Sequence, residues 1–279
     1  MNCSRRDLLK YSAGCAALAA LGFPLRGAAD GKKIPVALQL YSLRKECAKD
    51  LPGMLAAVAK IGFRGVEFAG YHGRTAKELR KLLDDDGLVC CGTHTGLDTL
   101  LGDAWAKTLE FNQTLGNKFL IVPSLPHARV ATAQACRDTA KLFNELAAKG
   151  KTCGMRVGYH AHGGDFKKID GETIWDLLFG NTGADVVMQL DTGNCLDGGG
   201  DPVAMLKKYP GRAVTIHLKE HGGPKAAAIG EGVVPWQQVF EVCETTGGTE
   251  WYIVEHEVGS DPLKSLADCY AFLKKCGKV

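Results

Sequence analysis

Residues 155–162 of this 279-residue chain read MRVGYHAH, and three similar segments follow: VVMQLDTGN at 186–194, AVTIHLKE at 213–220 and WYIVEHE at 251–257. Each begins as a short apolar run of strand type and has a metal-type side chain at its C-terminal end, namely His160, Asp191, His217 and Glu255. Because a parallel α/β sheet gathers the C-terminal ends of its strands on one rim, we expect these four side chains to converge. Two imidazoles and two carboxylates suit a divalent cation.

Four earlier segments complete a regular pattern. Short, apolar, β-branched runs at 36–41, 64–68, 88–93 and 118–122 have the character of strands buried on both faces. Helical segments alternate with the eight strands, and we expect them from Asp50 to Gly62, from Thr75, and at 103–115, 131–149, 172–179, 202–208, 235–245 and 262–275. This alternation predicts a single-domain α/β fold, the (β/α)8 TIM barrel, and we favour it over a doubly wound open sheet.

The N-terminus predicts an export signal. Residues 4–10 read SRRDLLK, and an apolar stretch follows as far as Leu25, which is the twin-arginine pattern. Small residues at 27–29 suit cleavage, so we expect a signal peptide at 1–29 and a mature periplasmic barrel at 30–279. The stretch is too short and too rich in Ala and Gly for a membrane span. The alternative is an amphipathic helix of a cytoplasmic protein.

Charge and cysteine content narrow the partners. The chain has 34 basic and 31 acidic residues, and removal of 1–29 leaves 30 of each. We therefore expect no nucleic-acid partner and no membrane contact after signal cleavage, and we leave homo-oligomer formation open. Eleven cysteines without a CxxC or a pairing pattern argue against a disulfide framework.

Further polar residues lie at or just beyond the predicted strand ends, where barrel enzymes carry their chemistry. For a single histidine the alternative is a structural hydrogen bond, and Asp191 could instead cap a helix. The candidate acids, bases and oxyanion-stabilising groups are Glu67, His94, His162, Lys219 and Glu255, and the candidate substrate contacts are Gln39, Tyr41, His127, Asn194 and Glu257.

The motifs GYHAHGGDF, QLDTGN, IHLKE, IGEGVVPW and YIVEHE resemble the sugar phosphate isomerase/epimerase family, which has a xylose-isomerase-like barrel. The resemblance covers the chain from about Ile34 to the C-terminus. It implies one divalent metal ion (Mn²⁺, Mg²⁺, Co²⁺ or Zn²⁺) held by His160, Asp191, His217 and Glu255. It also implies a small-molecule sugar or keto-sugar substrate and proton transfer beside a carbonyl, as isomerisation, epimerisation or hydration and dehydration.

Three positions depart from the patterns of relatives. The epimerases carry a glutamate where this chain has His160, so a symmetric two-glutamate epimerisation is in doubt, and the change favours hydration or dehydration. Asp165 stands where a glutamate is common and is a candidate substrate contact. Asn194 replaces a histidine of the related apurinic endonucleases, which argues against that branch. A non-catalytic carbohydrate-binding barrel and a metal-dependent hydrolase remain as alternatives.

Overall fold

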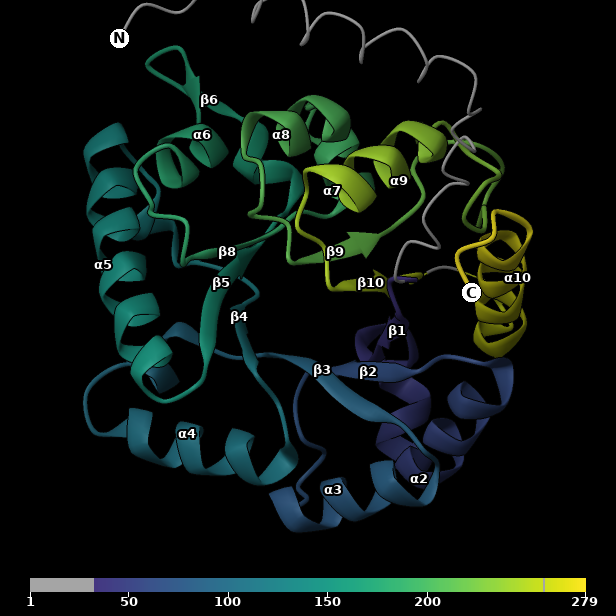
Figure 1. Cartoon of the computed structure of the whole chain (residues 1–279). Helices are drawn as coiled ribbons and strands as arrows, with labels where there is room; N and C mark the ends of the chain where they lie inside the picture. The colour runs from purple at the N-terminus through teal and green to yellow at the C-terminus, as the bar shows by residue number, and fades with distance from the viewer. Residues whose placement is uncertain (1–32, 258) are drawn as a thin grey trace, which may run out of the picture. The chain divides into compact units, whose positions relative to one another are not determined.

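Eight parallel strands form the centre of the structure (Figure 1), a computed structural model that describes residues 33–257 and 259–279. The predicted signal peptide at 1–29 lies outside the described residues. The strands are β1 Val36–Gln39, β2 Gly65–Phe68, β3 Val89–His94, β4 Phe119–Val122, β5 Arg156–His160, β8 Val187–Gln189, β9 Thr215–Leu218 and β10 Trp251–Val254.

The strands neighbour one another in the order β8-β5-β4-β3-β2-β1-β10-β9. The two ends of this order meet through a parallel bridge between Asp191 and His217, and the His217 backbone N–H donates to the Leu190 carbonyl over 2.8 Å. The sheet therefore closes into a barrel, which confirms the predicted (β/α)8 fold and excludes the open sheet.

Helices surround the strands (Figure 1) and cover the apolar outer face of the barrel. They are α2 Arg44–Ile61, α3 Ala76–Asp85, α4 Ala104–Leu115, α5 Ala133–Thr152, α6 Ile174–Phe179, α7 Thr192–Asp197, α8 Pro202–Lys208, α9 Trp236–Thr245 and α10 Pro262–Lys275. Short 3₁₀ helices follow four strands, at η1 Leu40–Leu43, η2 Leu97–Leu100, η3 His127–Arg129 and η4 Gly163–Phe166. Within the described residues, no helix has the length and apolarity needed to cross a membrane.

Two helix starts differ from the prediction. Helix α2 begins at Arg44, with a kink at Asp50, whose side chain accepts from the Gly53 N–H over 2.9 Å. The cap signal at Asp50 therefore marks the second half of this helix, and its first half begins without a side-chain cap. Residues Glu172–Thr173, predicted as helix, form strand β7 of a hairpin with β6 (Lys168–Ile169). Asp170 and Gly171 turn the chain with φ of 52° and 93°, as a type I′ turn requires.

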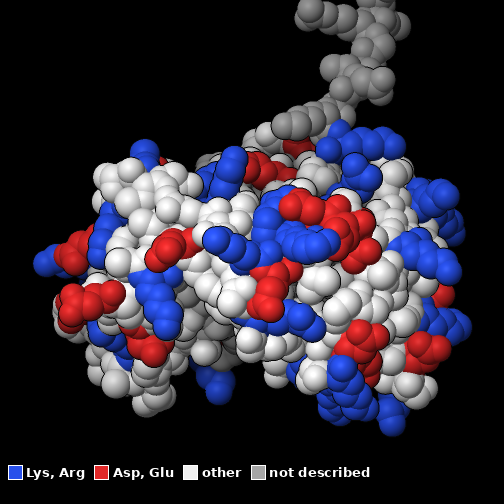
Figure 2. Space-filling model, turned by 90° about the horizontal axis from the view of Figure 1, so that it is seen from below, with Lys and Arg blue, Asp and Glu red and all other residues white. Residues whose placement is uncertain are grey.

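The surface carries charges of both signs. On the face seen in Figure 2, Lys and Arg side chains are interspersed with Asp and Glu rather than gathered in one patch. Helix α3 contributes two exposed i,i+4 ion pairs, Arg80–Asp84 and Lys81–Asp85. Solvent screens ion pairs this exposed, so they contribute little to the stability of the fold.

The barrel interior changes from apolar to polar along the strands. Two small apolar clusters fill it, one of which contains Val187 and the other Ala37 and Ile253. Because side chains alternate along a strand, the residue two positions further along faces the same way. Those residues are Gln39, Gln189 and Glu255, all buried. The C-terminal end of the barrel interior is therefore lined with polar groups.

Candidate metal centre and active site

The four residues predicted to converge do so at the C-terminal end of the barrel. His160 ends β5, Asp191 is the N-cap of α7, His217 lies in β9 and Glu255 directly follows β10. One possible ligand atom from each of them lies within 4.8 Å of all the others. All four side chains are buried, with 0–5% of their surface exposed. The spatial condition on which a shared metal site depends is therefore met.

His217 is at the centre of this cluster. Its Nδ1 lies 2.8 Å from Glu255 Oε2 and 3.8 Å from Asp191 Oδ2, while its Nε2 lies 2.6 Å from Glu67 Oε2. The ring thus joins the two candidate carboxylate ligands on one side to a third, buried carboxylate on the other. This is the arrangement of a metal-binding histidine whose second nitrogen is held by a carboxylate.

Two atoms of the cluster support the fit to a cation. Among the described residues, His160 Nδ1 and Asp191 Oδ2 are buried without a hydrogen-bond partner. Buried polar atoms are nearly always satisfied, so such exceptions mark a missing partner. Asp191 Oδ1 accepts from the Asn194 N–H over 2.7 Å, which caps α7. A metal ion at Oδ2 would leave the capping oxygen Oδ1 free for its hydrogen bond, so the two predicted roles of Asp191 are compatible.

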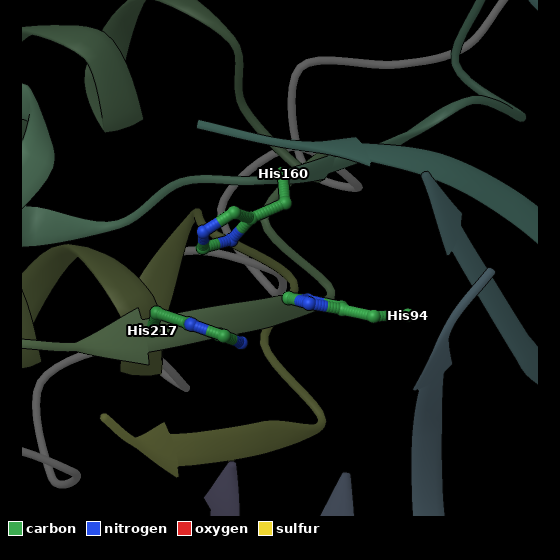
Figure 3. A group of neighbouring side chains, drawn as sticks. All are labelled: His94, His160 and His217. Atoms are coloured by element: carbon green, nitrogen blue, oxygen red, sulfur yellow. The ribbon is translucent and has the colours of Figure 1, made fainter. Parts of the chain in front are cut away.

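A third histidine adjoins the cluster (Figure 3). The ring centres of His94 and His160 lie 4.9 Å apart, and those of His160 and His217 lie 4.4 Å apart. These three residues form a second candidate ligand group. The group with Asp191 and Glu255 fits a divalent cation better, because its two carboxylates supply compensating negative charge.

The electrostatics of the cluster are those of buried charges in close contact. Burial and then repulsion from Glu255 raise the pKa of Asp191 to about 7. Burial opposes a charge on His217, but Glu67 and Glu255 outweigh it and raise the His217 pKa to about 10. Burial and the neighbouring histidines lower the pKa of His160 well below its ordinary value. A metal ion held through Nδ1 would displace a proton from His217.

A cavity of about 530 Å³ opens above the cluster. Its lining includes His160 and Glu255 together with several other predicted site residues: Tyr41, His94, His162, Asn194, Lys219 and Glu257. Lys219 Nζ donates to Glu255 Oε1 over 2.9 Å and to Glu257 Oε1 over 2.5 Å. Burial opposes the charge of Lys219, but Glu255, Asp191 and Glu257 outweigh it and raise the Lys219 pKa. Burial lowers the pKa of His162, so this imidazole is neutral.

Four other predicted site residues are not among those that line the cavity in the described part of the chain. Gln39 and Glu67 are fully buried and hydrogen-bond to each other over 2.7 Å. Asp165 accepts from the Tyr159 hydroxyl (3.0 Å) and from the His162 backbone N–H (2.8 Å). His127 begins the 3₁₀ helix η3. The acid or base role of Glu67 and the substrate contacts of Gln39, His127 and Asp165 stay predictions.

Gln189 belongs to the site but was missed by sequence reasoning. Its Nε2 donates to Glu67 Oε1 over 2.8 Å and to Thr215 Oγ1 over 3.0 Å. Its Oε1 lies 3.0 Å from His94 Nε2. Since this oxygen can only accept, His94 Nε2 carries a proton. The signal was present, because Gln189 stands two residues before Asp191 on the same strand face.

Known proteins resemble the chain over most of its length. The rhizopine catabolism protein MocC of Rhizobium meliloti is 25% identical over 254 residues, which cover 78% of this chain and 77% of that protein. An inosose dehydratase of Erwinia tasmaniensis is 25% identical over 253 residues, with 76% and 83% covered. The solved structure of a sugar phosphate isomerase/epimerase from Parabacteroides distasonis matches with a TM-score of 0.78 at 25% identity, covering 90% of this chain and 97% of that one.

Two family matches divide the chain. Residues 2–22 match the twin-arginine translocation pathway signal sequence, so the chain carries a signal for export by that pathway. Residues 55–276 match the family described as xylose isomerase-like TIM barrel, which spans β2 to α10 and includes all four residues of the candidate metal centre. The chain therefore belongs to the xylose isomerase-like TIM barrel family.

Proposed function

We propose that the chain is an exported, divalent-metal-dependent enzyme that acts on a keto-sugar or a related polyhydroxy ketone by moving a proton beside the carbonyl. The observation that carries this proposal is the cluster of His160, Asp191, His217 and Glu255, whose candidate ligand atoms lie within 4.8 Å of one another. After export through the twin-arginine pathway the enzyme works in the periplasm.

A divalent cation bound there supplies Lewis acidity, which polarises a carbonyl oxygen and makes the neighbouring C–H bond acidic. The protein's own groups divide the proton transfers. His162 lines the cavity as a neutral imidazole and is suited to accept a proton. Lys219, protonated and held by Glu255 and Glu257, is suited to donate one or to stabilise a developing oxyanion.

This division favours dehydration over epimerisation. Epimerisation of the two-glutamate kind needs a carboxylate on each face of the substrate, and the strand-five position is His160 in this chain. An imidazole and an ammonium group instead provide one base and one acid. The base removes the proton on the carbon next to the carbonyl, and the acid protonates the hydroxyl that leaves as water. The inosose dehydratases among the relatives support this choice.

A substrate without a net charge suits the cavity. Among the described residues that line the cavity, Lys219 is the one lysine or arginine, and it forms ion pairs with both Glu255 and Glu257. Asp191 and Glu255 would balance the two charges of the cation. No unpaired cation is therefore left among the described lining residues for a phosphate or carboxylate group.

The test uses mature protein loaded with Mn²⁺, Co²⁺, Mg²⁺ or Zn²⁺ and a panel of neutral keto-sugars and cyclic polyhydroxy ketones in D₂O. Deuterium incorporation next to the carbonyl together with loss of water supports the dehydratase. Deuterium incorporation without loss of water assigns isomerisation or epimerisation instead. Binding without exchange or turnover favours the non-catalytic carbohydrate-binding barrel, and cleavage of glycosides or esters without exchange favours the hydrolase. Asp191→Asn, loaded in the same way, is the metal-site control.

A further inference from the structure

Glu67 lies at the C-terminal end of β2, and its buried carboxylate has no role in the proposed chemistry. It is 0% exposed. Its Oε2 accepts from Gln39 Nε2 over 2.7 Å and lies 2.6 Å from His217 Nε2 and 3.2 Å from His94 Nε2. Its Oε1 accepts from Gln189 Nε2 over 2.8 Å. Four side chains from four different strands or strand ends therefore point their nitrogen atoms at one carboxylate.

The directions of these hydrogen bonds are fixed by their neighbours. The Tyr41 backbone N–H donates to Gln39 Oε1 over 3.0 Å, so the amide nitrogen of Gln39 must face Glu67. The amide nitrogens of Gln39 and Gln189 can only donate, so each oxygen of Glu67 accepts a hydrogen bond from one of them. With both oxygens of Glu67 in use as acceptors, the 2.6 Å contact with His217 is one in which the His217 Nε2–H donates.

The backbone around Glu67 makes room for it. The register between β2 and β3 shifts between Val66 and Glu67, so that Glu67 stands opposite Gly92. A Cβ atom at position 92 would lie 2.5 Å from Glu67 Oε1, which is closer than the two atoms can approach. The β-bulge and the missing side chain at Gly92 together provide the space that the Glu67 carboxylate occupies.

We infer that Glu67 is a positioning residue, which holds the His217 ring with Nε2–H toward itself and Nδ1 toward Asp191 and Glu255. The inference rests on the proposed metal centre for its effect on metal binding. Glu67 acts through His217 and does not touch the substrate. This role differs from the catalytic acid or base that the sequence predicted for Glu67 from its position at a strand end.

The first test measures Co²⁺ binding to chelator-stripped mature protein by titration calorimetry, with the Co²⁺ absorption spectrum as a report on ligand geometry. Glu67→Gln keeps the shape but leaves one acceptor oxygen for four donors. We expect its affinity for Co²⁺ to fall 10–100-fold, as for other lost partners of metal-bound histidines, and its Co²⁺ spectrum to change. Gly92→Ala keeps the glutamate at position 67 but pushes its carboxylate out of position. We expect this variant also to bind Co²⁺ more weakly than the wild type.

Thr215→Val is the matched control. It removes the hydroxyl that accepts from Gln189 over 3.0 Å and leaves the contact between Glu67 and His217 intact. Its Co²⁺ affinity should stay within about threefold of the wild type, well short of the 10–100-fold loss. Unchanged Co²⁺ binding in Glu67→Gln would overturn the inference, and so would an equal loss in Thr215→Val, because the loss would then be general loosening of the cluster.

A second measurement does not depend on any metal. In ¹⁵N-histidine-labelled, metal-free protein, the His217 Nε2–H should give a slowly exchanging, hydrogen-bonded proton signal that disappears or moves in Glu67→Gln and Gly92→Ala. Its persistence in both variants would refute the positioning role. If the wild type binds no divalent ion while this signal behaves as expected, the proposed function fails and the role of Glu67 stands.

Discussion

Replacing Asp191 by asparagine should make the metal-free protein more stable while it weakens metal binding. Asp191 is fully buried, and its Oδ2, in the part of the chain that the structure describes, has no hydrogen-bond partner. Its second oxygen accepts from the Asn194 N–H, a contact that the amide oxygen of asparagine can keep. The substitution therefore removes a buried charge and leaves the cap of α7 in place.

The size of the effect follows from the two opposing costs. Burial and Glu255 raise the pKa of Asp191 from 3.8 to about 7, which corresponds to ~4 kcal/mol against the charged form at about pH 8. The new amide nitrogen has no acceptor at the Oδ2 position, which costs about 1–3 kcal/mol. A net gain of about 1–3 kcal/mol in unfolding free energy remains, or roughly 2–12 °C in Tm for a domain of this size.

The difference in stability between Asp191→Asn and the wild type also depends on pH. Because folding raises the pKa of Asp191, the stability contributed by its protonated side chain is full below the unfolded pKa of 3.8 and is lost as the pH rises through about 7. The advantage of Asp191→Asn should therefore be full near pH 8 and small near pH 5.

Thermal unfolding with a chelator and with Mn²⁺ measures both effects. Mn²⁺ should raise the Tm of the wild type and leave that of Asp191→Asn nearly unchanged. The control is Asp201→Asn, because Asp201 caps α8 by accepting from the Val203 and Ala204 N–H groups but is exposed. A metal-free Asp191→Asn protein less stable than the wild type at about pH 8, or one stabilised by Mn²⁺ as much as the wild type, would refute the reasoning.

Three further outcomes are expected. Lys219→Met should lower kcat about 100-fold while Mn²⁺ still raises the Tm, because Lys219 faces the cavity and is outside the ligand group; wild-type kcat would contradict this. Burial raises the pKa of Asp165 to about 6, so its contribution to stability should fall as the pH rises through about 4–6, and Asp165→Asn should flatten that part of the stability curve by up to ~3 kcal/mol. Glu220 accepts from three backbone N–H groups and from Trp236 Nε1; Glu220→Gln should speed amide hydrogen exchange in residues 221–235, and unchanged exchange would show that the segment is held otherwise.

The fold could be predicted because a parallel barrel leaves strong local signals. Strands buried on both faces appear as continuous apolar runs, and all eight predicted strands overlap observed ones. The misplaced helix starts had weaker signals. The first half of α2 has no side-chain cap, and Asp170-Gly171 lies next to strands of two residues each, too short to show alternation.

The candidate metal centre could be predicted because its members all stand at strand ends. What the sequence could not indicate is depth along the barrel axis. Glu67 lies near the end of β2 and Tyr41 just after the end of β1, yet Glu67 is fully buried and Tyr41 is 44% exposed and lines the cavity. The shift of register at Glu67 depends on how β2 pairs with β3, and the sequence of neither strand alone indicates it.

The junction of β8 and β9 has a consequence for how metal and fold depend on each other. The two residues of the bridge at this junction, Asp191 and His217, are also two of the four candidate ligands. An ion held by both residues would cross-link β8 and β9 at the point where the barrel closes. Metal binding would then stabilise the closure of the barrel, and we expect local unfolding of the metal-free protein to begin at this point.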